Sequence, residues 1–298
     1  MNDTLRENDS EKEYAILRLG PIVNVGDCEA RLGQEILSVF GGLPGELVKA
    51  RIYRYRKNKK HIISGIVENV IEASPYRIIP DCPNFGPCSG CQWQHVDYSY
   101  QLKFKKQIIS TAFASYDSLS GIDILNVIAS ENKFKYRNHA RFSVRFEGQM
   151  GFSNRITRRF IKIDECLIMD NRINEIVSIL QDKVSETTSM SVRVGVNTED
   201  VLIQPKLLSS DIPIETGQKS YVEKLYGKEF RIASPSFFQV NIDQAEKLIE
   251  IIKSELQFVG NEVLVDAYAG VGTFAIAFSS EVSKVIAIEE SAAAIKDA

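Results

Sequence analysis

The chain has 298 residues, of which 44% are hydrophobic and 25% charged, and its formal net charge is −3. This composition is typical of a soluble protein with two or three domains, and no apolar run is long enough to cross a membrane. The net charge taken alone argues against nucleic acid, but it hides two basic stretches. Residues 51–60 carry six Lys or Arg and no acid, and residues 133–162 carry nine Lys or Arg and a single acid. Basic residues interleaved with aromatic ones suit contact with phosphates and bases, although a solvated strand face fits each stretch equally well.

The first part of the chain reads as a polar tail followed by a small β-domain. Residues 1–12 are polar, and we expect a frayed tail there. The apolar, β-branched runs that follow are broken by Gly and Pro at 14–20, 26–33, 35–55 and 61–73. This punctuation predicts short strands that close into a small barrel over residues 13–73.

A cysteine-rich loop comes next, at residues 82–91, with the sequence CPNFGPCSGC. Cys82, Cys88 and Cys91 have the spacing C-x5-C-x2-C, and Cys166 is the candidate fourth ligand. Three thiols in one Gly/Pro-rich loop plus a distant fourth suit a tetrahedral metal or an iron–sulfur cluster. A disulfide is disfavoured because no secretion signal precedes the loop. The spacing alone does not separate zinc from iron–sulfur.

The middle of the chain, residues 74–225, is predicted to be a second, α+β domain that contains the cysteine loop. Residues 99–116 fit a helix with a basic side, in which Leu102, Ile108 and Ile109 are apolar. Strand-like runs then occur at 122–129, 140–147, 191–197 and 200–205, with one helical stretch at 170–184. His95 and His139 are expected at the surface or on a face that contacts RNA.

From residue 226 onward the pattern is that of an α/β domain. Residues 234–258 read as a loop and then an amphipathic helix, with Asn241 as its N-cap and an apolar face of Leu248, Ile251, Ile252 and Leu256. Residues 261–291 read as strand, glycine loop, helix and strand, which opens a doubly wound, Rossmann-like sheet.

The glycine loop, in VLVDAYAGVGTF, suggests a cofactor site. Asp266 ends the first strand, Gly270 and Gly272 permit close approach of a ligand, and Glu289 ends the next strand, 23 positions after Asp266. An acid at the second position can bind both ribose hydroxyls of an adenosine. NAD and S-adenosylmethionine both fit this pattern, and so does a tight turn with no ligand. We favour S-adenosylmethionine because its sulfonium and amino group suit a nearby carboxylate.

Taken together, these motifs resemble the bacterial RNA uracil-C5 methyltransferases that act on 23S ribosomal RNA and on tRNA. The resemblance runs from Tyr14 to Ala298. It implies an α/β plus β architecture in three parts: an OB-like TRAM barrel at 13–73, a central domain with an iron–sulfur loop at 74–225, and the start of a class I methyltransferase domain at 226–298. It also implies that Cys82, Cys88, Cys91 and Cys166 hold a [4Fe-4S] cluster.

The resemblance assigns further site residues. The segment SPSFFQVN (234–241) resembles the cofactor segment of that family, which implies that Gln239 contacts the cofactor. The segment DAYAGVGT (266–273) resembles its glycine loop, which implies that Tyr268 and Thr273 lie near S-adenosylmethionine. Glu289 matches the acid that binds the ribose in that family. KYRNHARF (135–142) resembles the basic strand beside the RNA site. The candidate RNA contacts are Arg54, Arg56, Lys57, Arg137 and Arg141.

The chemistry that the resemblance implies needs a nucleophile. A thiolate adds to uracil carbon 6, carbon 5 then takes the methyl group, and a general base removes the carbon 5 proton. The nucleophilic Cys and the base of that family lie in later strands of its methyltransferase domain. We therefore expect them beyond residue 298, interpret the chain as C-terminally truncated, and assign no catalytic residue.

Two other functions remain open from the sequence. One is a non-catalytic, cluster-containing RNA-binding protein, and the other is a fragment of a zinc-bearing dehydrogenase. The favoured prediction is a cytoplasmic S-adenosylmethionine-dependent enzyme that methylates uridine C5 in 23S ribosomal RNA or, second, in tRNA.

Overall fold

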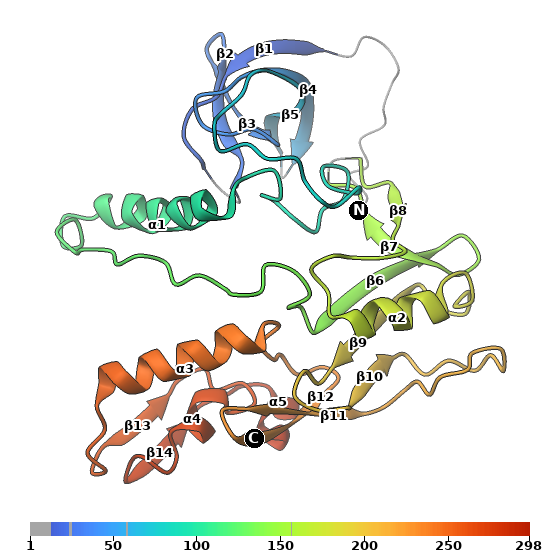
Figure 1. Cartoon of the computed structure of the whole chain (residues 1–298), viewed down its shortest axis with the longest axis vertical. Helices are drawn as coiled ribbons and strands as arrows, with labels where there is room; N and C mark the ends of the chain where they lie inside the picture. The colour runs from blue at the N-terminus through green and yellow to red at the C-terminus, as the bar shows by residue number, and fades with distance from the viewer. Residues whose placement is uncertain (1–12, 24–25, 58, 156) are drawn as a thin grey trace. The chain divides into compact units, whose positions relative to one another are not determined.

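A computed structural model describes residues 13–23, 26–57, 59–155 and 157–298, apart from the side chain of Lys57. The tail predicted at residues 1–12 lies outside the described residues. The chain divides into two compact units: Met1–Ala129 with Ser153–Ile161, and Ser130–Phe152 with Lys162–Ala298. Figure 1 shows the helices and strands of both units. No described helix is both long and apolar enough to span a bilayer.

The first unit contains a curled five-stranded sheet in the order β1-β4-β5-β3-β2. Its strands are β1 (Tyr14–Arg18), β2 (Cys28–Leu32), β3 (Glu35–Phe40), β4 (Leu47–Lys57) and β5 (Lys60–Glu72), all antiparallel to their neighbours except the β3–β5 pair. Backbone hydrogen bonds from Gly20 N to Glu29 O (2.7 Å) and from Glu29 N to Pro21 O (2.9 Å) join the two ends of the sheet. The strands predicted between residues 14 and 73 are therefore confirmed.

The interior of this sheet is filled by alternate residues of its strands. The buried set comprises Leu17, Leu19, Cys28, Ala30, Leu37, Val39, Val48, Ala50 and Ile52. Because side chains of a strand point alternately to its two faces, such a period-two pattern buries one face of the sheet.

Helix α1 (Tyr98–Ala114) confirms the predicted helix, and Asp97 caps it by accepting a hydrogen bond from Ser99 N. The buried residue of this helix is Phe104, which packs with Leu43 and Val96, whereas Ile108 and Ile109 are exposed. The strand expected at 122–129 is wrong. The segment after α1 runs as an extended chain (Figure 1) that joins no strand ladder among the described residues. β-branched composition alone does not make a strand where no neighbour completes its hydrogen bonds.

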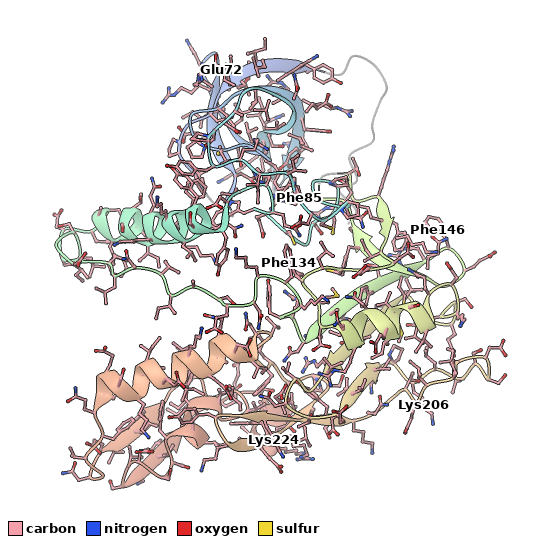
Figure 2. All side chains as sticks on the ribbon, in the orientation of Figure 1. Glu72, Phe85, Phe134, Phe146, Lys206 and Lys224 are labelled. Carbon is pink, nitrogen blue, oxygen red and sulfur yellow. The ribbon has the colours of Figure 1, made fainter. Side chains whose placement is uncertain are left out.

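A second sheet has the order β10-β9-β6-β7-β8. Its strands are β6 (His139–Arg145), β7 (Gln149–Ser153), β8 (Phe160–Lys162), β9 (Ser189–Val194) and β10 (Val201–Gln204). Helix α2 (Asn171–Leu180) buries Ile173, Ile176, Val177 and Leu180 in the core that it shares with this sheet. The strands predicted at 140–147, 191–197 and 200–205 and the helix predicted at 170–184 are thus confirmed. Phe146, in the turn between β6 and β7, projects outward (Figure 2).

The last part of the chain holds the hairpin β11 (Ser220–Leu225) and β12 (Lys228–Ala233), helix α3 (Ile242–Leu256), and the parallel pair β13 (Val263–Asp266) and β14 (Lys284–Ala287). Helix α4 (Thr273–Ala277) lies between β13 and β14 in sequence, and α5 (Ala292–Asp297) follows β14. The predicted order of strand, glycine loop, helix and strand is confirmed.

The N-cap predicted for α3 is right, and its predicted apolar face is right in part, because Ile252 packs against the core. The Asn241 side chain accepts a hydrogen bond from Gln244 N. The buried residues are Ile242, Ala245 and Ile249, while Leu248 and Leu256 are exposed. Apolar residues occupy two stripes of this helix, and packing against the neighbouring strands selects one of them.

Candidate functional site

The glycine loop follows the carboxyl end of β13, where an open α/β sheet places its ligands. Gly270 and Gly272 have φ angles of 55° and 79°, in the left-handed region that a side chain disfavours. A Cβ atom on Gly272 would also lie 2.9 Å from the side chain of Ile276. Helix α4 begins directly after Gly272, at Thr273. Both glycines are therefore required by the backbone, whether or not a ligand is bound.

Two carboxylates, at the end of β13 and just after β14, bind the backbone of the loop and of helix α4. Asp266 Oδ2 accepts a hydrogen bond from Ala275 N (3.1 Å), and Glu289 Oε2 accepts one from Gly270 N (2.8 Å). Glu289 Oε1 also accepts from Ser291 N (2.8 Å). The amides of Ser291 and Gly270 hold the pKa of Glu289 below its usual value, so this carboxylate is ionised at neutral pH. The loop is thus bordered by two acids, an arrangement that suits a cationic or hydroxyl-rich ligand better than a phosphate.

Of the remaining residues of the loop, Tyr268 is 95% exposed. The ring therefore has almost no contact with the rest of the described chain and is accessible to a ligand. Thr273 is partly buried at the first position of α4. Five of the predicted cofactor residues, Asp266, Gly270, Gly272, Thr273 and Glu289, are brought together in this way.

The segment 234–241, which contains Gln239, is tied down at both ends. Asn138 Nδ2 donates to Gln239 O (3.2 Å), and Asn138 N donates to Val240 O (3.1 Å). At the other end, the Asp297 carboxylate in α5 accepts hydrogen bonds from Ala233 N (2.7 Å) and Ser236 Oγ (2.6 Å). Gln239 is therefore held beside the start of β6 through its main chain. Sequence reasoning missed Asp297, whose side chain is only 3% exposed, because an acid at the end of a short helix resembles a solvated residue.

A cluster of basic groups lies across strands β6 and β9. His139 of β6 pairs in register with Arg193 of β9. Burial and, in decreasing order, the guanidinium groups of Arg193, Arg137 and Arg141 together lower the pKa of His139 to about 4, so His139 is neutral at pH 7. All three charged groups that act on this imidazole are positive, which makes the surface at β6 electropositive.

Arg193 connects the basic cluster to the segment 234–241. It is buried, and its Nη1 donates to Ser236 O (2.7 Å), while its buried Nε has no hydrogen-bond partner among the described residues. Sequence reasoning missed Arg193, although it lies in the strand predicted at 191–197. The predicted RNA residues Arg137 and Arg141 therefore lie near the neutral His139 and the buried Arg193.

The predicted RNA contacts of the curled sheet are placed differently. Arg54 donates to the carboxylates of Glu13 (3.0 Å) and Glu35 (2.8 Å), so its charge is already balanced. Arg56 is exposed near the end of β4, and the side chain of Lys57 lies outside the described residues.

The cysteine loop is a chain of tight turns. Phe85 N donates to Cys82 O (3.0 Å), and Cys88 N donates to Asn84 O (2.9 Å). Two donors point at sulfur atoms: Gly90 N at Cys88 Sγ (3.4 Å) and Gln94 Nε2 at Cys91 Sγ (3.2 Å). The ring of Phe85, labelled in Figure 2, lies 5.1 Å from that of His95. His95 itself is buried, which corrects the expectation that it lies at the surface.

The chemistry of this loop fits thiolate ligands. Burial raises the pKa of the Cys88 thiol, the amide of Gly90 lowers it, and the neighbouring Cys91 and Cys82 raise it again, so the neutral thiol form of Cys88 is favoured. A bound cation would reverse that effect, and N–H donors to sulfur are typical of cluster ligands. Cys166 belongs to the second unit, where its amide donates to Asn174 Oδ1 (2.9 Å). Within residues 13–23, 26–57, 59–155 and 157–298, no three metal-ligating side chains form a group that could hold an ion.

Comparison with known proteins gives a consistent result. No protein-family profile matches the chain, but 243 curated proteins match it in sequence. A protein of Nostoc named as an uncharacterized RNA methyltransferase is 24% identical over 96% of this chain and 74% of its own length. One of the same name from Staphylococcus aureus is 28% identical over 86% and 69%, respectively. The chain is a homologue of proteins named as RNA methyltransferases.

A solved structure supports this relationship at the level of the fold. The tRNA (uracil-54, C5)-methyltransferase of Pyrococcus abyssi, solved in complex with S-adenosyl-L-homocysteine, superposes with a TM-score of 0.68 at 21% identity. The superposition covers 96% of this chain and 75% of the other. The mixed α/β fold with its curled sheet is therefore shared between the two proteins.

Proposed function

We propose that this protein is an S-adenosylmethionine-dependent RNA methyltransferase of the uracil-C5 class. The observation that carries the proposal is the glycine loop bordered by the carboxylates of Asp266 and Glu289. Homologues named as RNA methyltransferases support the choice of this cofactor over NAD. S-adenosylmethionine supplies the methyl group, carried on a sulfonium.

The residues of this chain have separable roles in that proposal. Glu289 accepts the ribose hydroxyls, Asp266 faces the positive end of the cofactor, and Tyr268 covers the adenosine. Gln239, fixed by Asn138, donates to the cofactor from the opposite segment. Arg137 and Arg141 contact RNA phosphates, and the curled sheet of residues 13–73 is a TRAM-type RNA-binding module.

The cysteine loop enters the proposal as a cluster site. Cys82, Cys88, Cys91 and Cys166 would hold a [4Fe-4S] cluster, which would carry no electron in methyl transfer. The test is anaerobic purification of the chain. A brown wild-type protein with broad visible absorption, together with a Cys88→Ala variant that lacks this absorption, supports the cluster. A colourless protein with one bound zinc excludes it.

The fifth cysteine is not a suitable nucleophile. The Cys28 thiol is buried in the curled sheet, and burial, followed by the charges of Glu46 and Asp27, raises its pKa to about 12. A thiol of that pKa is not ionised at neutral pH and does not add to uracil. We therefore expect the 298-residue chain to bind cofactor and RNA without transferring a methyl group, and detection of 5-methyluridine in RNA incubated with it would refute this expectation.

The cofactor assignment is tested by photocrosslinking labelled S-adenosylmethionine to the purified chain. The label is expected in peptides from 234–241 or 263–289, and excess S-adenosylhomocysteine is expected to suppress it. A label confined to other peptides would contradict the proposed site. Filter binding with 23S ribosomal RNA fragments and tRNA then distinguishes the two candidate substrates, of which we favour the ribosomal RNA.

The alternative function is a cluster-containing RNA-binding protein without a methyl donor. The burial of the Cys28 thiol favours this alternative, because a protein that only binds RNA needs no nucleophile. Failure of S-adenosylmethionine to label the chain, together with tight RNA binding, would select this alternative.

A further inference from the structure

Three aromatic rings of the first unit form a ladder from its core to its surface. Phe104 is buried beside Leu43 and Val96. The ring of Tyr100 meets Phe104 edge-on at 4.7 Å and 73°, and the ring of Tyr76 stacks on Tyr100 at 3.6 Å and 12°. Tyr76 is the outermost ring and is 36% exposed. One face of the Tyr76 ring is thus covered by Tyr100, and the residue remains partly open to solvent.

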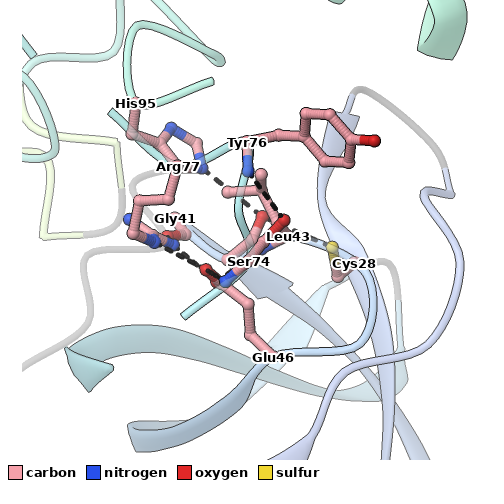
Figure 3. A network of polar contacts seen from close by, with 9 residues as sticks. Cys28, Gly41, Leu43, Glu46, Ser74, Tyr76, Arg77 and His95 are labelled. Carbon is pink, nitrogen blue, oxygen red and sulfur yellow. Dashed lines mark hydrogen bonds and ion pairs between the residues drawn. The ribbon is translucent and has the colours of Figure 1, made fainter. Parts of the chain in front are cut away.

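The backbone that carries these rings is held in place before any ligand arrives. Asp97, the N-cap of the helix that carries Tyr100, donates from its amide to Tyr76 O (2.9 Å). The next residue, Arg77, is bound through two nitrogens (each 2.7 Å) to the buried carboxylate of Glu46. Figure 3 shows the Tyr76 ring pointing away from this pair. Such a rigid ring loses little conformational entropy when a flat ligand stacks on it.

Lys103 lies beside the stack rather than over it. Its Nζ is 5.3 Å from the centre of the Tyr100 ring and 5.7 Å from that of Tyr76. An ammonium over the outer face of Tyr76 would be much farther from Tyr100, because the two rings are 3.6 Å apart along the stack. The nearly equal distances therefore place the charge at the rim of the two rings and leave the outer face of Tyr76 uncovered by Lys103.

We propose that Tyr76 is a platform on which an unpaired base of the RNA stacks, with Lys103 contacting the phosphate beside that base. A nucleotide presents a flat base and an anion to its side, which matches a ring face with a cation at its rim. This proposal deepens the proposed function, on which it rests for the identity of the ligand. It assigns RNA contacts to the 76–103 region, which the basic stretches of the sequence did not indicate.

The test is binding of a short fluorescent oligouridylate to the full chain, followed by fluorescence anisotropy. Stacking on an aromatic ring contributes roughly 1–3 kcal/mol per base, so Tyr76→Ala is expected to weaken binding about 5- to 150-fold. Tyr76→Phe keeps the ring and is expected to stay within about twofold of wild type. Lys103→Gln is expected to lower the slope of log affinity against log salt by about 0.7. Ile79→Ala, at an exposed apolar neighbour, is the matched control and is expected to bind as wild type.

Several results would overturn the platform. They are wild-type affinity for Tyr76→Ala, equal losses for Tyr76→Phe and Tyr76→Ala, or equal binding of an abasic oligomer that has phosphates without bases. Emission of Trp93, which packs edge-on against Phe104 at 5.8 Å, shows whether each variant is folded. If the chain does not bind S-adenosylmethionine but Tyr76→Ala still weakens RNA binding, the methyltransferase proposal is wrong and the proposal of a stacking platform stands.

Discussion

Two glutamates make the same type of contact in the two units but in opposite surroundings. In the first unit Glu46 has no exposed side-chain surface, and it accepts hydrogen bonds from the amides of Leu43 and Ser74 and from Arg77 (Figure 3). In the second unit Glu289 accepts from the amides of Gly270 and Ser291 at a partly exposed position. A buried carboxylate cannot exchange these partners for a ligand without a large cost, whereas an exposed one can. Glu46 is therefore expected to stabilise the fold, and Glu289 is expected to be able to bind a ligand.

The largest effect is expected when Glu46 is removed. Glu46→Ala leaves the Arg77 guanidinium and two amides without their acceptor, and breaking a buried ion pair costs roughly 3–5 kcal/mol. Urea unfolding followed by emission of Trp93, the single tryptophan of the chain and a residue of this unit, reports that loss. Glu289→Ala is the matched control and is expected to leave the Trp93 transition unchanged. A loss below about 1 kcal/mol for Glu46→Ala would remove the distinction between the two acids.

The second effect concerns cofactor affinity. Glu289→Gln keeps the shape of the side chain and removes its charge, so hydrogen bonds to ribose hydroxyls weaken. The affinity for S-adenosylmethionine is expected to fall about tenfold, with no change in the urea midpoint. Glu290→Gln, at the exposed neighbouring position, is expected to bind cofactor as wild type. An equal loss in both variants would assign the effect to net charge rather than to a contact.

A third prediction uses the pH dependence of the first unit. Burial and, second, the nearby Arg77 guanidinium together lower the pKa of His95 from 6.5 to about 4. The unfolded chain therefore binds more protons than the folded one between pH 6.5 and 4, and stability falls as the pH falls through that window. The urea midpoint seen by Trp93 is expected to drop from pH 7 to pH 4, and His95→Gln is expected to flatten the upper part of this decline. An unchanged slope in His95→Gln would contradict the assignment.

Below pH 4, the protonation of Glu46 governs how the stability of the first unit depends on pH. Burial, the largest influence, raises its pKa, but the hydrogen bonds from Arg77, Ser74 and Leu43 outweigh it, so the net pKa lies below 4.5. The stability that Glu46 contributes is present above the pKa of the unfolded chain and is lost as the pH falls through the lower folded value.

The smallest effect is expected at Arg54. Its charge is already balanced by Glu13 and Glu35 at the surface, so Arg54→Gln is expected to change RNA affinity by less than about twofold. Arg141→Gln, in the electropositive cluster of β6, is expected to weaken RNA binding more. Filter binding of both variants at one salt concentration checks the order, and a reversed order would move the RNA surface to the curled sheet.

The sequence predicted local features and missed the choices that packing makes. The strands of the curled sheet, helices α1 and α2, and the glycine loop followed from periodicity and turn residues. The prediction of a strand at 122–129 failed because a strand needs a partner. The face predicted for α3 was right at Ile252 and wrong at Leu248 and Leu256, because two apolar stripes compete on one helix. Within the site, the acids at Asp266 and Glu289 were found because strand ends converge. Asp297 and Arg193 were missed because their contacts join segments far apart in the chain.

If the glycine loop with its two acids is a site for S-adenosylmethionine, the full chain binds the labelled cofactor in equilibrium dialysis. We expect saturable binding that S-adenosylhomocysteine displaces, that NAD leaves unchanged, and that Glu289→Gln weakens. Absence of saturable binding, or displacement by NAD, would contradict it.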